Sequence, residues 1–404
     1  MHRRSTRQSP VLRWLPLTLG AAALACGGRS PGTSTPPPVD PVPPAPPSTP
    51  ALTGLTNGAM VSGSVELSAS APPGTARMEF RLDGADMASD MTAPFATTWD
   101  TFSAVNGAHT LAVSAIDGAG AATPSEPVQV TVSNHIKYVF VIVFENRDWS
   151  SIKGNSSAPY INNTLLVEGA HADNYETVPG LHPSLPNYIW MEAGGHLGVR
   201  DDAEPSQHLL TTSQHLVSLL RTAGITWKAY QEDIPGTDCP LTYVNQYAPK
   251  HLPMVYFADV NGGLDRNSSE CISHIRPYAE FARDLENNTV PAYSFITPNQ
   301  CNDMHDCSIG TGDAWLSREV PKVLGSRAYK DGGALFITFD ESAGSDVPIG
   351  FIAMSPLAKR GYSNEISYTH SSMLRSVQEI FGVTPLLGNA ANATNLGDLF
   401  RSFP

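Results

Sequence analysis

The sequence has few basic side chains for its length. Its 404 residues include 25 lysines and arginines against 38 aspartates and glutamates, a formal charge of −13. The first 25 residues carry four of the arginines and no acid, so the remainder holds 21 basic against 38 acidic residues, or −17. A surface of this charge repels nucleic-acid phosphates and offers no basic patch to anionic lipids, which argues against both kinds of partner.

The apolar stretch near the start is too short to cross a membrane. Leu15 to Ala25 follows a segment with four arginines, so we expect residues 1–25 to be a signal peptide that is removed on export. Ala23-Leu24-Ala25-Cys26 resembles a bacterial lipobox, which would attach a lipid to Cys26 and hold the protein at the cell envelope. Simple secretion is the alternative.

The five cysteines include no CxxC pair, which argues against a cysteine metal site. If Cys26 carries a lipid, four remain, and an even number in an exported chain predicts disulfides with three possible pairings. Proximity in the sequence favours Cys239 with Cys271 and Cys301 with Cys307.

Two changes of pattern divide the N-terminal part of the chain. Residues 26–50 are rich in proline and predict an extended, semi-rigid linker. Residues 51–134 show short alternating strands such as Met78-Phe80-Leu82, with a hairpin signal at Asp83-Gly84. Strands at this spacing predict a small β-sandwich, and the segment resembles the immunoglobulin-like modules of bacterial surface enzymes, without their cysteine pair.

Residues 135–404 alternate between buried-strand and helical patterns. We expect an α/β domain with a mainly parallel sheet covered by helices. The strand candidates are Tyr138 to Phe144, Gly333 to Phe339 and Ile349 to Met354, and the helix candidates are Ser213 to Ala223, Gly312 to Leu324 and Thr369 to Phe381.

Acidic side chains follow two of these strands. Glu145-Asn146 comes after the first run and Asp340-Glu341 after the second. Ligands of such sheets bind beyond the carboxyl ends of the strands, so the two pairs can converge on one ion, although either pair alone is more often solvated. Carboxylate and amide oxygens favour a hard divalent cation such as calcium, magnesium or manganese, whereas zinc more often recruits histidine.

A serine between prolines is the candidate nucleophile. Ser184 follows Pro183 and precedes Pro186 by two residues in LHPSLPNY, and both prolines restrict the local backbone. Serine needs a base or a metal to act as a nucleophile. Asn187, three residues on, could direct an amide donor at the group that Ser184 attacks. A structural loop serine is the alternative.

Seven stretches of the chain stand out together: FENRDW, HPSLPNY, YAPKHLPMVYF, SFITPNQCNDMHDC, GDAWLSREVPKVL, ITFDES and SYTHSSMLRSVQEIFG. In this order they resemble the secreted phosphoesterases that include bacterial and fungal acid phosphatases and bacterial phospholipases C, and whose fold is that of the alkaline phosphatase superfamily. The resemblance implies an alkaline-phosphatase-like sheet between helices, and it covers most of residues 137–381.

The resemblance also implies roles for single residues. Ser184 matches a nucleophile that forms a phosphoryl-enzyme intermediate and faces the metal. Asn187 matches an amide that holds a phosphate oxygen, and His305 and His251 match histidines of the phosphate pocket. The implied ligands of a single metal ion are Glu145, Asn146, Asp340 and Glu341. A protonated histidine would then stabilise charge or protonate the leaving oxygen, which favours mildly acidic pH.

The sequence therefore predicts an exported, metal-dependent phosphoesterase that hydrolyses phosphate monoesters, among which a phosphatidylinositol phosphate is one candidate. NDMHDC and the VPKVL region resemble the acid phosphatases most. A phospholipase C-like phosphodiesterase is the second hypothesis. A non-catalytic cell-surface protein that binds through its immunoglobulin-like module is the third. The physiological substrate and the oligomeric state stay open.

Overall fold

The computed structural model describes residues 49–344 and 346–404. The expected signal peptide, the lipid site at Cys26 and nearly all of the proline-rich linker lie outside these residues. No helix within the two described ranges has the length and apolar character needed to cross a bilayer.

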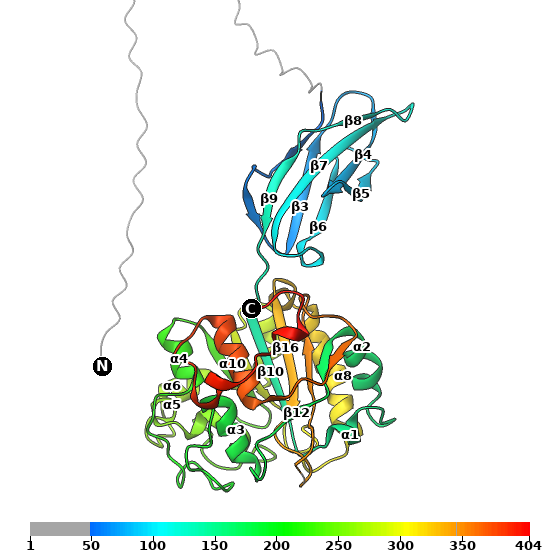
Figure 1. The fold of residues 1–404 in the computed structure, drawn as a ribbon. Coiled ribbons are helices and arrows are strands. Elements are labelled where there is room, and N and C mark those ends of the chain that lie inside the picture. The colour runs from blue at the N-terminus through cyan, green and yellow to red at the C-terminus, as the bar shows by residue number, and fades with distance from the viewer. Residues whose placement is uncertain (1–48, 345) are drawn as a thin grey trace, which may run out of the picture. The chain divides into compact units, whose positions relative to one another are not determined.

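The N-terminal strands form two sheets that enclose their own core (Figure 1). Phe80 and Trp99 are almost fully buried between them, as the alternating pattern predicts. Asp83 and Gly84 both have positive φ and connect two antiparallel strands, so the hairpin signal is confirmed. One sheet has the order β1-β3-β6 (Ala51–Thr53, Ser64–Ser70, Ala96–Asp100); the other has the order β2-β9-β7-β4-β5 (Ala59–Val61, Val128–Val132, Gly107–Asp117, Thr75–Leu82, Ala85–Asp90), with β8 (Ala122–Pro124) paired to β7.

The remainder of the chain is built on a mixed sheet of eight strands. Its order is β14-β13-β15-β10-β16-β17-β11-β18. Pairing is parallel from β14 through β16 and again between β11 and β18, whereas β17 runs antiparallel to both of its neighbours. The strands are β14 (Ile275–Pro277), β13 (Trp227–Gln231), β15 (Tyr293–Thr297), β10 (Tyr138–Phe144), β16 (Gly333–Phe339), β17 (Phe351–Met354), β11 (Ala170–Ala172) and β18 (Tyr362–Asn364). Outside this sheet, β12 (Tyr175–Glu176) and β19 (Tyr368–Thr369) form a separate parallel pair.

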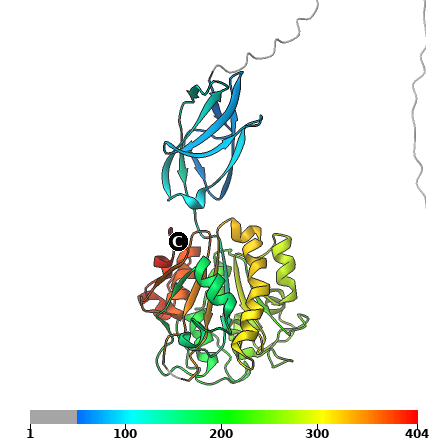
Figure 2. The same ribbon diagram turned by 90° about the vertical axis from the view of Figure 1, so that its right-hand side faces the viewer.

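Helices cover both faces of this sheet. In Figure 1, α3, α4 and α10 lie on one side of β10 and β16, and α2 and α8 lie on the other. Figure 2 shows α8, in yellow, on the face of the sheet that is turned toward the viewer. The three expected helices are confirmed as α4, α8 and α10. The helices are α1 Trp149–Ile152, α2 Leu166–Glu168, α3 Ser184–Ala193, α4 Leu216–Thr222, α5 Ala258–Asn261, α6 Ser269–His274, α7 Ala279–Glu286, α8 Ile309–Gly325, α9 Arg327–Lys330 and α10 His370–Phe381.

The central strands are buried on both faces, which explains their uninterrupted apolar sequences. Every side chain of β16 is buried, and so is every side chain of β10 after Tyr138. Phe144 pairs with Phe339 in the parallel register. The residues that follow these two positions therefore leave the sheet side by side.

Two disulfides hold loops of this part of the chain. Cys239 is bonded to Cys271, and Cys301 is bonded to Cys307. Both pairings confirm the prediction from sequence proximity.

A buried ionic network attaches helix α3 to its neighbours. His215, just before α4, lies 2.9 Å from Glu192 of α3 and 2.9 Å from Asp259 of α5, and its ring stacks on Phe257. Burial alone would lower the pKa of His215, but hydrogen bonds to the two carboxylates outweigh it and raise the pKa to about 8. The folded protein therefore favours the protonated histidine.

We predict that this histidine makes stability depend on pH. Its folded pKa of about 8 exceeds the ordinary value of 6.5, so its contribution is complete below pH 6.5 and is lost as the pH rises through 8. The loss between pH 6 and pH 9 is about 2 kcal/mol of unfolding free energy. Urea titrations of wild type and His215→Gln should show this pH-dependent difference, with His208→Gln as a control. An equal pH dependence in all three proteins would contradict the assignment.

Candidate active site

Ser184 is the first residue of α3 and is almost fully buried, so the proline-bracketed stretch starts a helix and is not a free loop. Its hydroxyl donates a hydrogen bond to Glu145 Oε2 at 3.0 Å. Tyr188, one turn later on the same helix, donates to the other oxygen of Glu145. The helix thus presents two hydroxyl groups to the carboxyl group that follows β10.

The four predicted metal ligands gather at the ends of β10 and β16. Asn146 has a left-handed backbone (φ 44°), and its N–H donates to Asp340 Oδ1 at 3.0 Å. Asn146 Oδ1 and Asp340 Oδ2 are buried, and neither has a hydrogen-bond partner in the part of the chain that the structure describes. Glu341 is also buried, and its Oε2 accepts from Asn187 Nδ2 at 3.3 Å.

The carboxyl groups here are buried close to one another. Burial, reinforced by the charges of Asp340 and Asp303, raises the pKa of Glu145 well above its ordinary value. Burial likewise raises the pKa of Asp340 to about 6, of Asp303 to about 8 and of Glu341 to about 9. Buried carboxylates are stable only when positive charge or hydrogen bonds compensate them. The unpartnered oxygens of Asn146 and Asp340 therefore fit a hard cation, which prefers such ligands.

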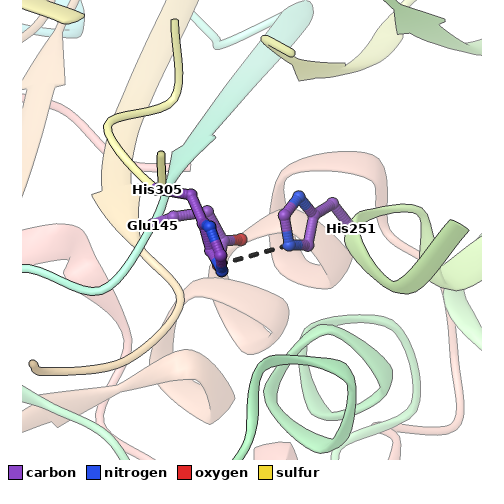
Figure 3. Close-up of side chains that lie close together, drawn as sticks. All are labelled: Glu145, His251 and His305. Carbon is purple, nitrogen blue, oxygen red and sulfur yellow. Dashed lines mark ion pairs between the residues drawn. The ribbon is translucent and has the colours of Figure 1, made fainter. Parts of the chain in front are cut away.

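His251 lies between Glu145 and Asp303, and Figure 3 shows its ring directed at Glu145. Its Nε2 is 3.3 Å from Glu145 Oε2, its Nδ1 is 3.3 Å from Asp303 Oδ2, and its ring stacks on Tyr188. Burial, together with the nearby Lys250 and His305, lowers the pKa of His251 well below its ordinary value. The expectation of a protonated histidine therefore does not fit His251, because this buried position favours the neutral ring.

His305 lies in the loop closed by the Cys301–Cys307 disulfide. Its Nδ1 is 2.7 Å from Asp306 Oδ1, and its ring centre is 5.8 Å from that of His251. Glu145, His251 and His305 each offer one potential ligand atom, and these three atoms lie within 4.8 Å of one another (Figure 3). Both predicted histidines are thus at the site, close enough to Glu145 to approach the same bound group.

Asn187 is at the site, but its amide faces inward. Its Nδ2 lies 2.8 Å from the Leu181 carbonyl oxygen and 3.3 Å from the Pro183 carbonyl oxygen and from Glu341 Oε2. Its Oδ1 is buried and, among residues 49–344 and 346–404, has no partner. In this orientation the amide supports the loop before Ser184, and rotating it would exchange its oxygen and nitrogen.

Two further histidines contact Asp340 and Glu341. His182 Nδ1 is 2.5 Å from Glu341 Oε2. His370 Nε2 is 2.6 Å from the Asp340 carbonyl oxygen, and its Nδ1 is 3.0 Å from the hydroxyl of Tyr175. Burial lowers the pKa of His370 to about 4, so this ring is neutral and positions the backbone behind the site.

Sequence reasoning missed four polar residues here. Tyr188 was predictable, since it lies four residues after Ser184 on a helix. Asp303 and Lys250 stand within the motifs that contain His305 and His251, yet their contacts depend on how separate loops meet. Nothing in the sequence pattern indicated Asp202. In the folded chain its carboxylate accepts hydrogen bonds from Leu185 N at 2.9 Å and from Lys250 Nζ at 2.9 Å.

Comparisons with known proteins identify the family. The phosphoesterase family matches residues 155–384, and the bacterial Ig domain family matches residues 49–113. The chain is 32% identical over 266 residues to a phosphatidylinositol-3-phosphatase of Mycobacterium tuberculosis, covering 65% of this chain and 82% of that protein. It is 28% identical over 309 residues to a probable acid phosphatase of Kluyveromyces lactis, covering 70% of each.

A phospholipase C B of M. tuberculosis is more distant, at 24% identity over 216 residues, 48% of this chain and 40% of that protein. The family match spans more than half of the chain and includes Ser184, His251 and His305. The chain therefore belongs to the phosphoesterase family and is a hydrolase that acts on phosphoric ester bonds.

Proposed function

We propose that this protein is an exported phosphomonoesterase in which Ser184 is the nucleophile. One observation carries the proposal: the Ser184 hydroxyl lies at the start of α3 and donates to Glu145, at the site that holds the buried oxygens of Asn146 and Asp340. We further propose that residues 51–134 form an immunoglobulin-like module and residues 135–404 form the catalytic domain. The family match favours catalysis over a purely binding role.

We propose that one divalent cation, such as calcium, magnesium or manganese, is held by Glu145, Asn146, Asp340 and Glu341 with Ser184 facing it. Two members of this set support it, because Asn146 and Asp340 each have a buried oxygen without a hydrogen-bond partner in the described part of the chain. When bound, such an ion supplies positive charge that favours an ionised serine oxygen and ionised carboxyl groups.

The side chains of the site suit a two-step phosphoryl transfer. In the first step the Ser184 oxygen forms a bond to phosphorus while the bond to the leaving alcohol breaks, and the hydroxyl proton passes toward Glu145 Oε2, its hydrogen-bond acceptor. The alcohol takes up a proton from solvent. In the second step water attacks phosphorus and the bond between phosphorus and the Ser184 oxygen breaks. That oxygen takes back the proton held at Glu145, inorganic phosphate leaves, and one proton of the attacking water passes to solvent. His251 and His305 line the position of the phosphoryl group beside Glu145.

The relatives support a monoester substrate. Two of the relatives are named as phosphatases, one of them for an inositol phospholipid, which makes phosphoinositides a candidate substrate class. The weaker match to a phospholipase C keeps phosphodiester hydrolysis as the second candidate.

Replacing the nucleophile should abolish turnover without unfolding the protein. Ser184→Ala should lower kcat by at least about 1000-fold, the scale expected when a nucleophile is removed. Thermal unfolding and metal content should be unchanged. Ser294→Ala is a matched control, since Ser294 is also a buried serine, on strand β15. Retained turnover in Ser184→Ala would show that the serine is structural.

Removing the cation should also stop the reaction. Treatment with a chelator should abolish hydrolysis, and readdition of a divalent cation should restore it. Asp340→Asn should contain less metal by elemental analysis, because a carboxylate ligand is lost. Asp284→Asn is the control, since Asp284 of helix α7 pairs with Lys228 of strand β13. Full activity in protein shown to be free of metal would refute the ion's role.

Two aryl substrates separate the two candidate activities. Purified protein should hydrolyse p-nitrophenyl phosphate with a higher kcat/KM than p-nitrophenyl phosphorylcholine. The opposite preference would favour the phosphodiesterase.

A further inference from the structure

Lys250 is a buried cation next to the acidic cluster. It precedes His251 in a short 3-10 helix (Pro249–His251), and its side chain is 10% exposed. Burial lowers the pKa of Lys250, but the charge of Glu145 and the hydrogen bond to Asp202 outweigh this effect and raise it. The ammonium therefore remains charged across the pH range in which a phosphatase operates.

The contacts of this ammonium leave one donor available. Its Nζ lies 2.9 Å from Asp202 Oδ2 and 3.5 Å from His305 Nε2. A lysine ammonium has three N–H donors, and none of the residues that the structure describes accepts the third. One ring nitrogen of His305 lies within 4.8 Å of ligand atoms of Glu145 and His251, so the ammonium, which contacts this ring, borders the same centre.

Asp202 links this ammonium to the nucleophile. While Oδ2 accepts from Lys250, Oδ1 accepts at 2.9 Å from the N–H of Leu185, the residue after Ser184. One carboxylate therefore fixes the cation relative to the start of α3. The Asn187 amide nitrogen is directed at the Leu181 carbonyl and its neighbours, so Lys250 is the better placed donor.

We propose that Lys250 binds a non-bridging oxygen of the phosphoryl group, that Asp202 positions it, and that this contact favours monoesters over diesters. The proposal rests on the function proposed above for the Ser184 site. A phosphate monoester near neutral pH carries close to two negative charges on three non-bridging oxygens. A diester has one charge on two such oxygens, so it gains less from an additional cation.

Inorganic phosphate is the probe that tests this contact. Lys250→Met should raise the inhibition constant of phosphate at least about tenfold and lower kcat/KM for p-nitrophenyl phosphate by roughly 100-fold to 1000-fold, as expected for removing one charged donor. The loss for p-nitrophenyl phosphorylcholine should be smaller. Lys250→Arg should recover part of the phosphate affinity, because it restores a charged donor.

The position of Asp202 is tested separately. Asp202→Asn keeps an oxygen for the Leu185 N–H but presents an amide to the ammonium, so phosphate affinity should fall. The buried ammonium loses its carboxylate partner, so thermal stability should fall as well, and inhibition is therefore measured below the onset of unfolding. Lys228→Met is the matched control: Lys228 also pairs with an aspartate, Asp284, but away from the site, and its loss should leave phosphate inhibition within about twofold.

Two results would overturn the inference. One is unchanged phosphate inhibition in Lys250→Met with wild-type metal content. The other is an equal loss of kcat/KM for both substrates, which would mean that Lys250 only compensates the buried acids. Wild-type protein that fails to hydrolyse p-nitrophenyl phosphate would instead refute the proposed monoesterase itself.

Discussion

The parallel pairing of β10 with β16 is the constraint on which the site depends. It places Glu145 and Asp340 next to each other at the end of two strands that are buried on both faces. Carboxyl groups taken out of water cost several kcal/mol each unless other groups compensate them. The neighbouring polar groups, from Ser184 and Tyr188 on α3 to the N–H of Asn146, are arranged to meet these oxygens.

The loop closed by Cys301 and Cys307 is a second element fixed to the same strand end. The Asp303 carbonyl oxygen accepts from the N–H of Glu145, and the Asp303 carboxylate lies against His251. Asp303 Oδ1 also accepts from the N–H of His305. The loop therefore carries His305 to the site and holds His251 through Asp303. In this way three distant sequence motifs meet around Glu145.

The parts of this arrangement that follow from local pattern could be predicted. The apolar runs gave β10 and β16, and the rule that ligands bind beyond strand ends placed Glu145 and Asp340 together. The antiparallel direction of β17 could not be predicted, because a short apolar run indicates a buried strand but not whether it pairs parallel or antiparallel. The inward orientation of the Asn187 amide depends on carbonyl groups of the preceding loop, which no sequence pattern specifies.

Charge states were the hardest feature to foresee. A protonated histidine was expected at the site, but full burial beside Lys250 favours the neutral form of His251. Lys250 is instead the charged neighbour, because Asp202 and Glu145 lie close enough to hold its proton. Such effects arise from residues more than forty positions apart that meet only in the folded chain, for example Asp202 and Lys250.

The central claim is that Ser184 carries the phosphoryl group during turnover. The most direct measurement is an acid quench of the wild-type protein during hydrolysis of a phosphate-labelled monoester, followed by peptide mapping. The account predicts labelled phosphate on the peptide that contains Ser184, and none in Ser184→Ala. Label on His251 or His305, or turnover that continues in the alanine variant, would contradict it.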